Sequence, residues 1–243
     1  MYLTEKVALV TGGAVRLGKA IALGLAEAGA DIVITYSSSE GPAQETAAEI
    51  RALGREAVVI QADFGRSQDM SGLADAVLSK FGHWDILINS AAIFEPGEWD
   101  STDEANWDRH FDINLKAPFF LTQAFALAAK ARGYRGHVVN IADWRGARPG
   151  TDHVAYTLTK VALIGMTQSM ALALAPEVQV NAIAPGLILP PPGASEAFVA
   201  RKATEIPLAR PGSPAEIVHA VRYLLASDFV TGELIYVTGG EHL

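Results

Sequence analysis

Residues 6–28 read KVALVTGGAVRLGKAIALGLAEA, and this stretch decides the fold. A short apolar run ends at Val10, a glycine-rich turn covers Thr11–Gly18, and an Ala- and Leu-rich helical stretch runs from Lys19 to Ala28. A strand, a turn and a helix in this order can form a pyrophosphate site. The glycines let the pyrophosphate approach the backbone, and the free N–H groups and positive dipole end of the helix meet its charge. The stretch therefore predicts a first βα unit that binds a dinucleotide. A purely structural turn is the alternative, and the Walker lysine pattern of phosphoryl transfer is absent.

The rest of the chain alternates short β-branched runs with longer amphipathic helical stretches, which is typical of a doubly wound parallel sheet. Buried parallel strands are continuous apolar runs rather than alternating ones. The predicted strands are Lys6–Val10, Asp31–Tyr36, Ala57–Gln61, Ile86–Asn89, His137–Ile141, Gln179–Ile183 and Leu234–Val237. We expect one α/β domain of the Rossmann type over residues 1–243, with seven parallel strands flanked by helices. The irregular segment at about 186–213 is either a substrate loop or an ordinary surface loop.

Composition and charge exclude several classes of protein. The 243 residues include 19 Lys and Arg against 27 Asp and Glu, a formal charge of −8, without the basic runs typical of nucleic-acid or membrane binding. The absence of cysteine excludes disulfides and thiolate sites, and the six His show no HExxH-like grouping, so no metal is expected. The first ten residues do not resemble a signal peptide, and no apolar run is expected to span a bilayer. We therefore expect a cytoplasmic protein.

The segment after the second predicted strand distinguishes NAD from NADP. NAD sites usually carry an Asp or Glu about 20 residues after the glycine-rich turn, whereas Tyr36, Ser37 and Ser38 stand here. Hydroxyl donors leave room for a 2′-phosphate, and Arg16 can supply its countercharge, so NADPH is the expected cofactor. The alternative is that the serines only start the next helix and that Arg16 is solvated. Asp63, after the third strand, is a candidate for binding the adenine amine or for capping a turn.

Tyr156 and Lys160 are candidates for a catalytic pair. They lie four residues apart in the helical stretch Val154–Ala175, so both side chains lie on one face of the helix. A phenol has a pKa near 10, and a neighbouring ammonium lowers it by favouring the phenolate. The pair therefore predicts a tyrosine that exchanges a proton with a substrate near neutrality.

Taken together, these motifs resemble the short-chain dehydrogenase/reductase family from Lys6 to the end of the chain. The residues that carry the resemblance are the cofactor turn Thr11, Gly12, Leu17 and Gly18, the central-strand motif Asn89-Ser90-Ala91, Asn114, Tyr156, Lys160 and the pair Pro185-Gly186. The resemblance implies that Asn114 holds a water linking Lys160 to solvent, that Lys160 binds the nicotinamide ribose and that Tyr156 protonates the reduced substrate. It also implies a homotetramer.

Two departures from the general family pattern resemble pteridine reductases. Arg16 stands where the turn commonly has Gly, and Asp143 stands thirteen residues before Tyr156, where Ser is common. Phe94 follows the central-strand motif as in that subgroup, and the ending Gly239–Leu243 is similar to bacterial members that reduce dihydromonapterin or dihydrofolate. The resemblance implies that Arg16, Phe94, Asp143 and Tyr156 bind the substrate.

Electrostatics independently favour a pterin. Carbonyl reduction places negative charge on oxygen, which an ionised Asp143 repels, whereas a carboxyl can bind the N–H groups of a ring whose C=N bond is reduced. A carboxylate beside Tyr156 also raises the phenol pKa and favours the protonated donor. Phe94 can stack on a flat ring or belong to the core, and Asp143 can instead cap a turn or pair with Arg145 or Arg148.

An NADPH-dependent pteridine reductase that reduces a dihydropterin or dihydrofolate is the leading hypothesis. An NADPH-dependent carbonyl or 3-oxoacyl reductase of the same fold is the enzymatic alternative. A nicotinamide-binding sensor without catalysis is the third possibility.

Overall fold

The computed structural model describes residues 1–66, 68–191 and 193–243, in which the strands form one seven-stranded parallel sheet of order β3-β2-β1-β4-β5-β6-β7. The strands are β1 (Val7–Val10), β2 (Asp31–Tyr36), β3 (Ala57–Gln61), β4 (Ile86–Asn89), β5 (Gly136–Ile141), β6 (Val178–Pro185) and β7 (Leu234–Val237). The predicted doubly wound fold is confirmed. β6 runs on to Pro185 because its last residues stay paired with β7, where Pro185 lies opposite Val237.

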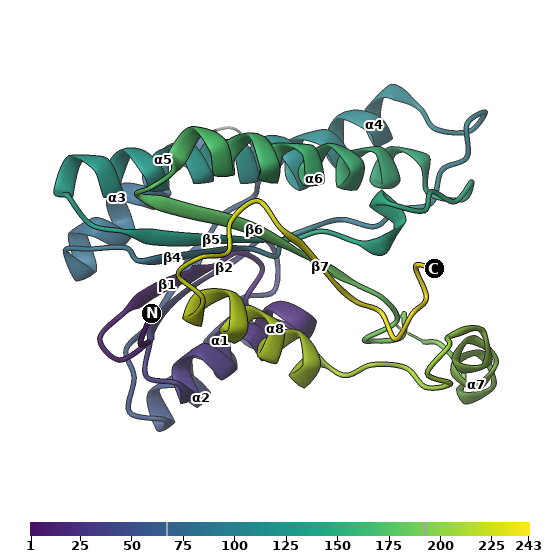
Figure 1. The fold of residues 1–243 in the computed structure, drawn as a ribbon, viewed down its shortest axis with the longest axis horizontal. Coiled ribbons are helices and arrows are strands. Elements are labelled where there is room, and N and C mark those ends of the chain that lie inside the picture. Colours follow the sequence, from purple (N-terminus) through teal and green to yellow (C-terminus); the bar gives the residue numbers. More distant parts are fainter. Residues whose placement is uncertain (67, 192) are drawn as a thin grey trace.

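Helices cover both faces of the sheet (Figure 1). One face carries α1 (Arg16–Glu27), α2 (Glu40–Ala52) and α8 (Pro214–Ala226). The other carries α3 (Gln68–Phe81), α4 (Glu104–Phe111), α5 (Ala117–Arg132) and α6 (Val154–Leu174). A π-helical turn, η1 (Asp112–Lys116), joins α4 to α5, and a short 3₁₀ turn, η2 (Trp144–Gly146), follows β5. The remaining helix, α7 (Glu196–Glu205), projects from one end of the molecule.

The strand pleat divides the buried apolar side chains between two cores. In β2, Ile32 and Ile34 belong to the cluster shared with α1 and α8, whereas Val33 belongs to the cluster on the opposite face. Successive side chains of a strand point to opposite faces, so a strand covered on both faces must be apolar at every position. This explains why the predicted strands are continuous apolar runs.

The candidate site lies where the strand order reverses, between β1 and β4. β1 pairs with β2 on one side and with β4 on the other, with Val10 opposite Ile34 and Ile88. Ligands of doubly wound sheets bind at the carboxyl ends of strands where the order reverses. The glycine-rich turn leaves β1 at this point, and α1 begins at Arg16 rather than at the predicted Lys19.

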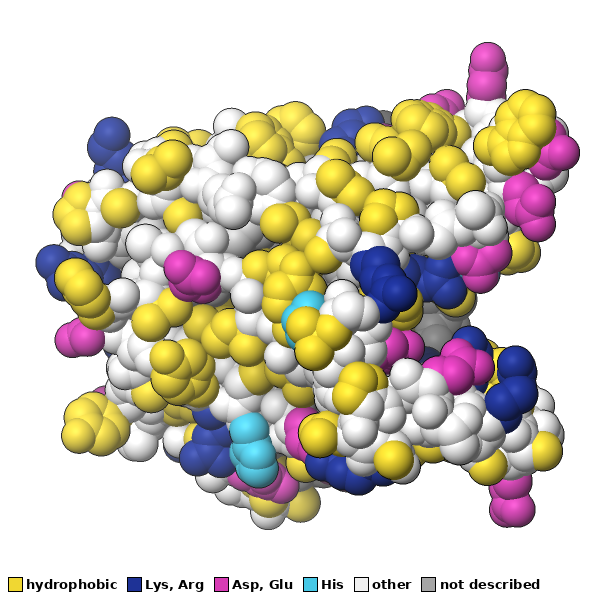
Figure 2. Space-filling model, turned by 45° about the vertical axis from the view of Figure 1, so that its right-hand side comes forward, with side chains coloured by type: hydrophobic (Ala, Val, Ile, Leu, Met, Phe, Trp, Pro, Cys, Tyr) yellow, Lys and Arg dark blue, Asp and Glu magenta, His cyan; other side chains and the backbone are white. Residues whose placement is uncertain are grey.

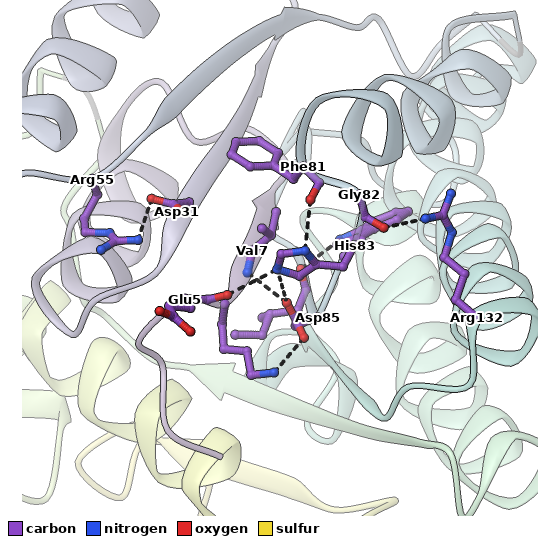
Figure 3. A network of polar contacts seen from close by, with 12 residues as sticks. Glu5, Val7, Asp31, Arg55, Phe81, Gly82, His83, Asp85 and Arg132 are labelled. Carbon is purple, nitrogen blue, oxygen red and sulfur yellow. Dashed lines mark hydrogen bonds and ion pairs between the residues drawn. The ribbon is translucent and has the colours of Figure 1, made fainter.

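At the amino ends of the strands, on the side of the sheet away from the glycine-rich turn, Asp85 joins β1 to β4 (Figure 3). Its carboxylate accepts hydrogen bonds from Lys6 Nζ at 2.9 Å and from the N–H of Val7 at 3.0 Å, and it lies 3.3 Å from His83 Nε2. Asp85 is only 3% exposed, so these contacts compensate the burial of a carboxylate. Its role is therefore to hold the strands in register.

Among the described residues, α6 is the one helix that is long and apolar enough, by length and composition alone, to cross a membrane. The same helix packs on β6 and η1 and carries Lys160 in a buried position. Core helices of water-soluble proteins also pass such a test.

Candidate active site

The glycine-rich turn is attached to the ends of two neighbouring strands. Thr11 Oγ1 accepts hydrogen bonds from the N–H groups of Ser90 and Ala91 at 2.9 and 3.0 Å. The N–H of Gly12 donates to Thr35 Oγ1 at 3.1 Å. Because both hydroxyls are buried, they hold the turn against β4 and β2 without help from a ligand. Sequence reasoning missed Thr35, although a polar residue near the end of an apolar strand was a usable signal.

Two glycines shape this turn into an anion cradle. Gly12 has a φ of +64°, and a Cβ there would lie 3.1 Å from Ala91 Cα. A Cβ on Gly18 would lie 2.2 Å from the carbonyl oxygen of Gly12, so α1 could not approach the turn as closely with any other residue. Val15 precedes α1 and offers no side-chain acceptor to its first N–H groups. These N–H groups and the helix dipole suit a pyrophosphate.

A cleft of about 420 Å³ opens beside this turn. Ten of the predicted cofactor residues line it: Gly12, Arg16, Leu17, Gly18, Tyr36, Ser37, Ser38, Asp63, Ser90 and Ala91. Further lining residues that the sequence did not single out include Thr35, Ala62, Phe64, Ile93, Ile113 and Ile141. All of these except Thr35 are apolar, and they come from strand ends, from the loops that follow them and from η1, so only the folded chain brings them together. The cleft has the place and lining of a dinucleotide site.

Five predicted cofactor residues lie outside this lining: Asn89, Tyr156, Lys160, Pro185 and Gly186. Asn89 is buried and its Nδ2 donates to Asn140 Oδ1 at 2.8 Å, so its side chain forms a hydrogen bond within the protein interior. Pro185 ends β6, and the N–H of Gly186 donates to the Val237 carbonyl at 3.0 Å. Contact between these residues and a cofactor stays a prediction.

The residues expected around a 2′-phosphate, Arg16, Ser37 and Ser38, all line the cleft. Ser37 and Ser38 precede α2, and Ser39 is the residue at its N-cap, so only Ser39 starts the helix directly. Arg16 is exposed with a φ of +51°, and its Nη2 donates to the Pro190 carbonyl at 3.0 Å. Arg16 is therefore not merely solvated, because it connects the cofactor turn to the substrate loop.

Asp63 has a local structural role as well as a place in the cleft. Its Oδ1 accepts the N–H of Gly65 at 3.0 Å, and its Oδ2 lies 3.5 Å from Arg66 Nε. The turn interpretation of Asp63 is therefore confirmed. Contact with adenine stays a prediction.

Asp143 and Tyr156 are in direct contact. The Tyr156 phenol donates a hydrogen bond of 2.7 Å to Asp143 Oδ2. Burial raises the pKa of Tyr156 well above its ordinary value, and the charge and hydrogen bond of Asp143 raise it further. The phenol is consequently a protonated donor across the neutral range.

The structural alternative for Asp143 also holds in part. Asp143 Oδ1 accepts the N–H of Arg145 at 2.8 Å and so caps η2, which aims the second oxygen at Tyr156. The alternative ion pairs are wrong. The Arg145 guanidinium binds the carboxylate of Asp152, and Arg148 donates to the carbonyl oxygen of Leu243.

Lys160 lies over one face of the Tyr156 ring, with Nζ 5.5 Å from the ring centroid. Its Nζ donates to the Ile141 carbonyl at 2.8 Å. Burial lowers the pKa of Lys160 to about 8, against the opposing charge of Asp143, so the ammonium remains mainly charged at pH 7. The expectation that Lys160 lowers the Tyr156 pKa is wrong: burial and Asp143 raise this pKa, and the positive group that opposes the rise is Arg145.

Asn114 lies in the π-helical turn η1, a type of turn that is frequent at functional sites. Its Oδ1 accepts the N–H of Ile93 at 2.9 Å, and its Nδ2 donates to the carbonyl of the same residue at 3.0 Å. Ile93 and Ile141 both line the cleft, so Asn114 and Lys160 each hold one side of it. The predicted water and ribose contacts are not tested by this geometry.

Phe94 is 51% exposed, so the alternative that it belongs to the core is wrong. One face of its ring stacks on the His153 imidazole at a centroid distance of 3.9 Å, and Tyr156 meets it edge-on at 4.6 Å. Sequence reasoning missed His153, although its position three residues before Tyr156 places it beside the same pocket. In the view of Figure 2, basic and acidic side chains border a notch on the right-hand side of the molecule.

Comparison with known proteins places the chain in a family. The family model described as enoyl-(acyl carrier protein) reductase matches residues 13–242. The 3-oxoacyl-(acyl-carrier-protein) reductase FabG of Staphylococcus aureus is 35% identical, over 98% of both chains.

Solved structures extend this result. FolM alternative dihydrofolate reductase 1 from Brucella canis, complexed with NADP, is 37% identical with a TM-score of 0.92, over 100% of this chain and 96% of that one. A blue fluorescent protein from a metagenomic library, complexed with NADPH, is 32% identical with a TM-score of 0.91, over 99% of both chains. This chain therefore belongs to the short-chain dehydrogenase/reductase family and is an NADPH-dependent oxidoreductase.

Proposed function

We propose that this protein is a pteridine reductase that uses NADPH to reduce a dihydropterin or a dihydrofolate ring. The observation that carries the proposal is the hydrogen bond of 2.7 Å between the Tyr156 phenol and the Asp143 carboxylate. It places a protonated donor and an acceptor side by side next to the cofactor cleft. The dihydrofolate reductase named in the Brucella canis structure supports the same substrate class.

The sign of the charge at this position favours a ring C=N bond over a ketone. A ketone that accepts hydride develops an alkoxide, and two unit charges 4 Å apart repel by about 4 kcal/mol at an effective dielectric constant of about 20. A pterin instead presents N–H groups, which donate to a carboxylate, and a basic ring nitrogen, which accepts a proton. Asp143 therefore opposes the first reaction and assists the second.

Each catalytic residue has a separable task. Bound NADPH supplies the hydride from its dihydronicotinamide ring. Tyr156 holds the proton at Oη, ready for transfer to the reduced ring, and Asp143 orients this hydroxyl. Lys160 and Asn114 hold Ile141 and Ile93, so that the inner wall of the cleft is rigid.

The cofactor contacts follow from the cleft. The turn between Gly12 and Gly18, with the start of α1, would hold the pyrophosphate. Ser37, Ser38 and Arg16 would hold the 2′-phosphate, because Arg recognises phosphate bidentately and serines rather than a carboxylate stand directly after β2. The exposed surface of Phe94 would stack on the flat pterin ring, in addition to its contact with His153.

The second candidate is an NADPH-dependent carbonyl or 3-oxoacyl reductase. The similarity to the Staphylococcus aureus 3-oxoacyl reductase and the description of the family model favour it. A non-catalytic sensor is disfavoured, because Asn114, Tyr156 and Lys160 are all present and Tyr156 has a proton acceptor in contact.

We also infer that residues 1–243 form one cytoplasmic domain that assembles into a homotetramer. All strands of the described residues join one sheet. Exposed apolar side chains gather on α5 and α6, including Phe120, Leu127, Val161 and Leu172, the last of them 86% exposed. Burial of such helix faces against a second copy would remove apolar surface from water.

The test of the substrate class is NADPH oxidation by the purified protein with a panel of compounds. The panel contains dihydromonapterin, dihydrofolate, simple ketones and a 3-oxoacyl thioester. We expect turnover with the dihydropterin or dihydrofolate and little with the others. Turnover restricted to the ketones or the thioester would replace the proposal with the second candidate.

A further inference from the structure

The segment that follows β6 is closed at its base by one residue, Leu187. The Leu187 carbonyl accepts the N–H of Gly212 at 2.8 Å, which joins the outgoing and returning ends of the substrate loop. The N–H of Leu187 donates to Glu241 Oε2 at 2.9 Å. The neck of the loop therefore has one bond within the loop and one bond to a separate segment. Pro192, within the loop, lies outside the described residues.

The separate segment is the tail Thr238–Leu243, which turns back on itself. Gly239 and Gly240 have φ values of +64° and +95°, which L-residues with a side chain rarely adopt. Thr238 Oγ1 accepts the N–H of Gly240 at 3.2 Å and contacts His242 Nδ1 at 2.8 Å. The His242 ring in turn stacks on Tyr236 at 4.1 Å. This local structure holds the tail in place.

The backbone opposite Glu241 is shaped to receive its carboxylate. A Cβ on Gly186 would lie 2.5 Å from Glu241 Oε2, so any larger residue at position 186 would meet the carboxylate. The contact between Glu241 and Leu187 thus depends on the absence of a side chain at Gly186. This gives the Pro185-Gly186 pair a role in holding the loop, in addition to any contact with cofactor.

The same tail also touches the segment that carries Asp143. Arg148, just after η2, donates to the carbonyl oxygen of Leu243. Burial raises the pKa of Glu241, the hydrogen bond from Leu187 lowers it, and the negative charge of Asp143 raises it. Arg145 and Lys202 are the positive groups that oppose this effect. The tail therefore links the η2 segment to the substrate loop.

We propose that Glu241 is a positioning residue that fastens the substrate loop at Leu187 and so holds this loop beside the segment that carries Asp143. Its carboxylate accepts the hydrogen bond from Leu187, and the folded tail holds the carboxylate in place for this contact. The role applies to a pterin and to a carbonyl substrate alike, because it sets the position of the loop and not the chemistry. The loop has further attachments: the N–H of Leu208 donates to the Gly239 carbonyl of the tail at 3.1 Å, and Arg16 of the cofactor turn donates to the Pro190 carbonyl.

Two variants at Glu241 separate the hydrogen bond from the charge. Glu241→Gln keeps an acceptor oxygen and removes the charge, whereas Glu241→Ala removes both. Glu233→Gln is the matched control, because Glu233 is an exposed carboxylate at the start of β7. Thermal unfolding and NADPH binding verify that each variant is folded and retains its cofactor cleft.

The first readout is the rate of tryptic cleavage after Arg201 and Lys202, which lie in α7 within the loop. We expect cleavage of Glu241→Ala to be about tenfold faster than that of the wild type, with Glu241→Gln close to the wild type. This assay needs no substrate, so it remains decisive whichever compound the enzyme reduces. Equal cleavage rates in the wild type and in a folded Glu241→Ala variant would overturn the proposal.

The second readout is the substrate kinetics. We expect Glu241→Ala to raise KM for the substrate by about tenfold with a smaller change in kcat, because loss of one hydrogen bond that positions the loop weakens binding by about that factor. Glu241→Gln should restore most of the KM, and Glu233→Gln should behave as the wild type. A KM in Glu241→Gln as high as in Glu241→Ala would show that charge and not loop attachment is at work, and would also overturn the proposal.

Discussion

Asp143 divides its two oxygens between Arg145 and Tyr156, accepting the backbone N–H of the former at 2.8 Å and the phenol of the latter at 2.7 Å. The first bond fixes the carboxylate on the turn η2, and the second joins it to the proton donor. Because one bond orients the group for the other, the carboxylate has little freedom to turn away from Tyr156. This arrangement makes Asp143 the most informative position for mutation.

Asp143→Ser should reduce dihydropterin turnover by about 10²-fold or more, because a positioned acid–base group typically contributes that much. The same variant should raise ketone reduction, since the repulsion of a developing alkoxide is removed. The measurement is kcat/KM for both substrates with NADPH. Asp108→Ser, at an exposed position of α4, is the control and should leave both values unchanged. A Ser variant with undiminished pterin turnover would refute the assigned role.

Tyr156→Phe should lower kcat by about 10²- to 10⁴-fold, because it removes the proton donor while the ring remains in its buried place. NADPH binding should survive, since Tyr156 lies outside the lining of the cleft. Fluorescence titration with NADPH measures binding, and steady-state assays measure turnover. If cofactor affinity collapsed together with activity, Tyr156 would have to be considered a structural residue.

Ser37→Asp should move the cofactor preference from NADPH towards NADH. A carboxylate at the end of β2 can bind ribose hydroxyls, but it repels a 2′-phosphate. We expect kcat/KM for NADPH to fall by about tenfold or more, with a smaller change for NADH. Unchanged discrimination between the two cofactors would place the phosphate elsewhere in the cleft.

His137 predicts a specific dependence of stability on pH. Burial lowers the pKa of His137 from 6.5 to about 4, with a smaller effect from the N-terminal ammonium. The neutral ring is therefore favoured in the folded state, so its contribution is complete above pH 6.5 and is lost as the pH falls from 6.5 towards 4. The loss amounts to about 3 kcal/mol in free energy of unfolding, from about 1.4 kcal/mol per pKa unit.

The check is urea unfolding of the wild type and His137→Gln between pH 7 and pH 4. The difference in free energy of unfolding between the two should shrink across this range, because the variant has no proton to bind. His219→Gln, at an exposed position of α8, is the matched control and should run parallel to the wild type. Parallel curves for His137→Gln would contradict the prediction.

Asp85→Asn should lower the free energy of unfolding by about 1–3 kcal/mol, because Lys6 and the N–H of Val7 lose a charged acceptor in a buried place. The folded variant should retain its kcat, since Asp85 lies just before the amino end of β4, whereas the cleft lies at the carboxyl ends of the strands. Chemical denaturation and steady-state kinetics test the two statements. Asp75→Asn, at an exposed position of α3, should stay within about 0.5 kcal/mol of the wild type.

Much of the fold was open to prediction because its determinants are local. The apolar runs of β2 and β3 and the Gly12–Gly18 turn specify strand and turn over a few residues each, and a buried parallel strand tolerates no polar alternation. The pair Tyr156 and Lys160 was equally predictable, because helical periodicity alone puts residues four apart on one face. The residue type at position 143 indicated a departure from the common pattern. It did not indicate which groups the Asp143 carboxylate contacts.

The sequence by itself thus determined the sheet, the cofactor turn and the identity of the catalytic pair. Tertiary structure alone decided that Asp143 contacts Tyr156, that Phe94 stacks on His153, and that Glu241 binds Leu187 from 54 residues away. Arg16 and Pro190 meet across 174 residues. The physical reason is that such contacts depend on where the strands end and how the loops return, and no local preference of the chain encodes those distances.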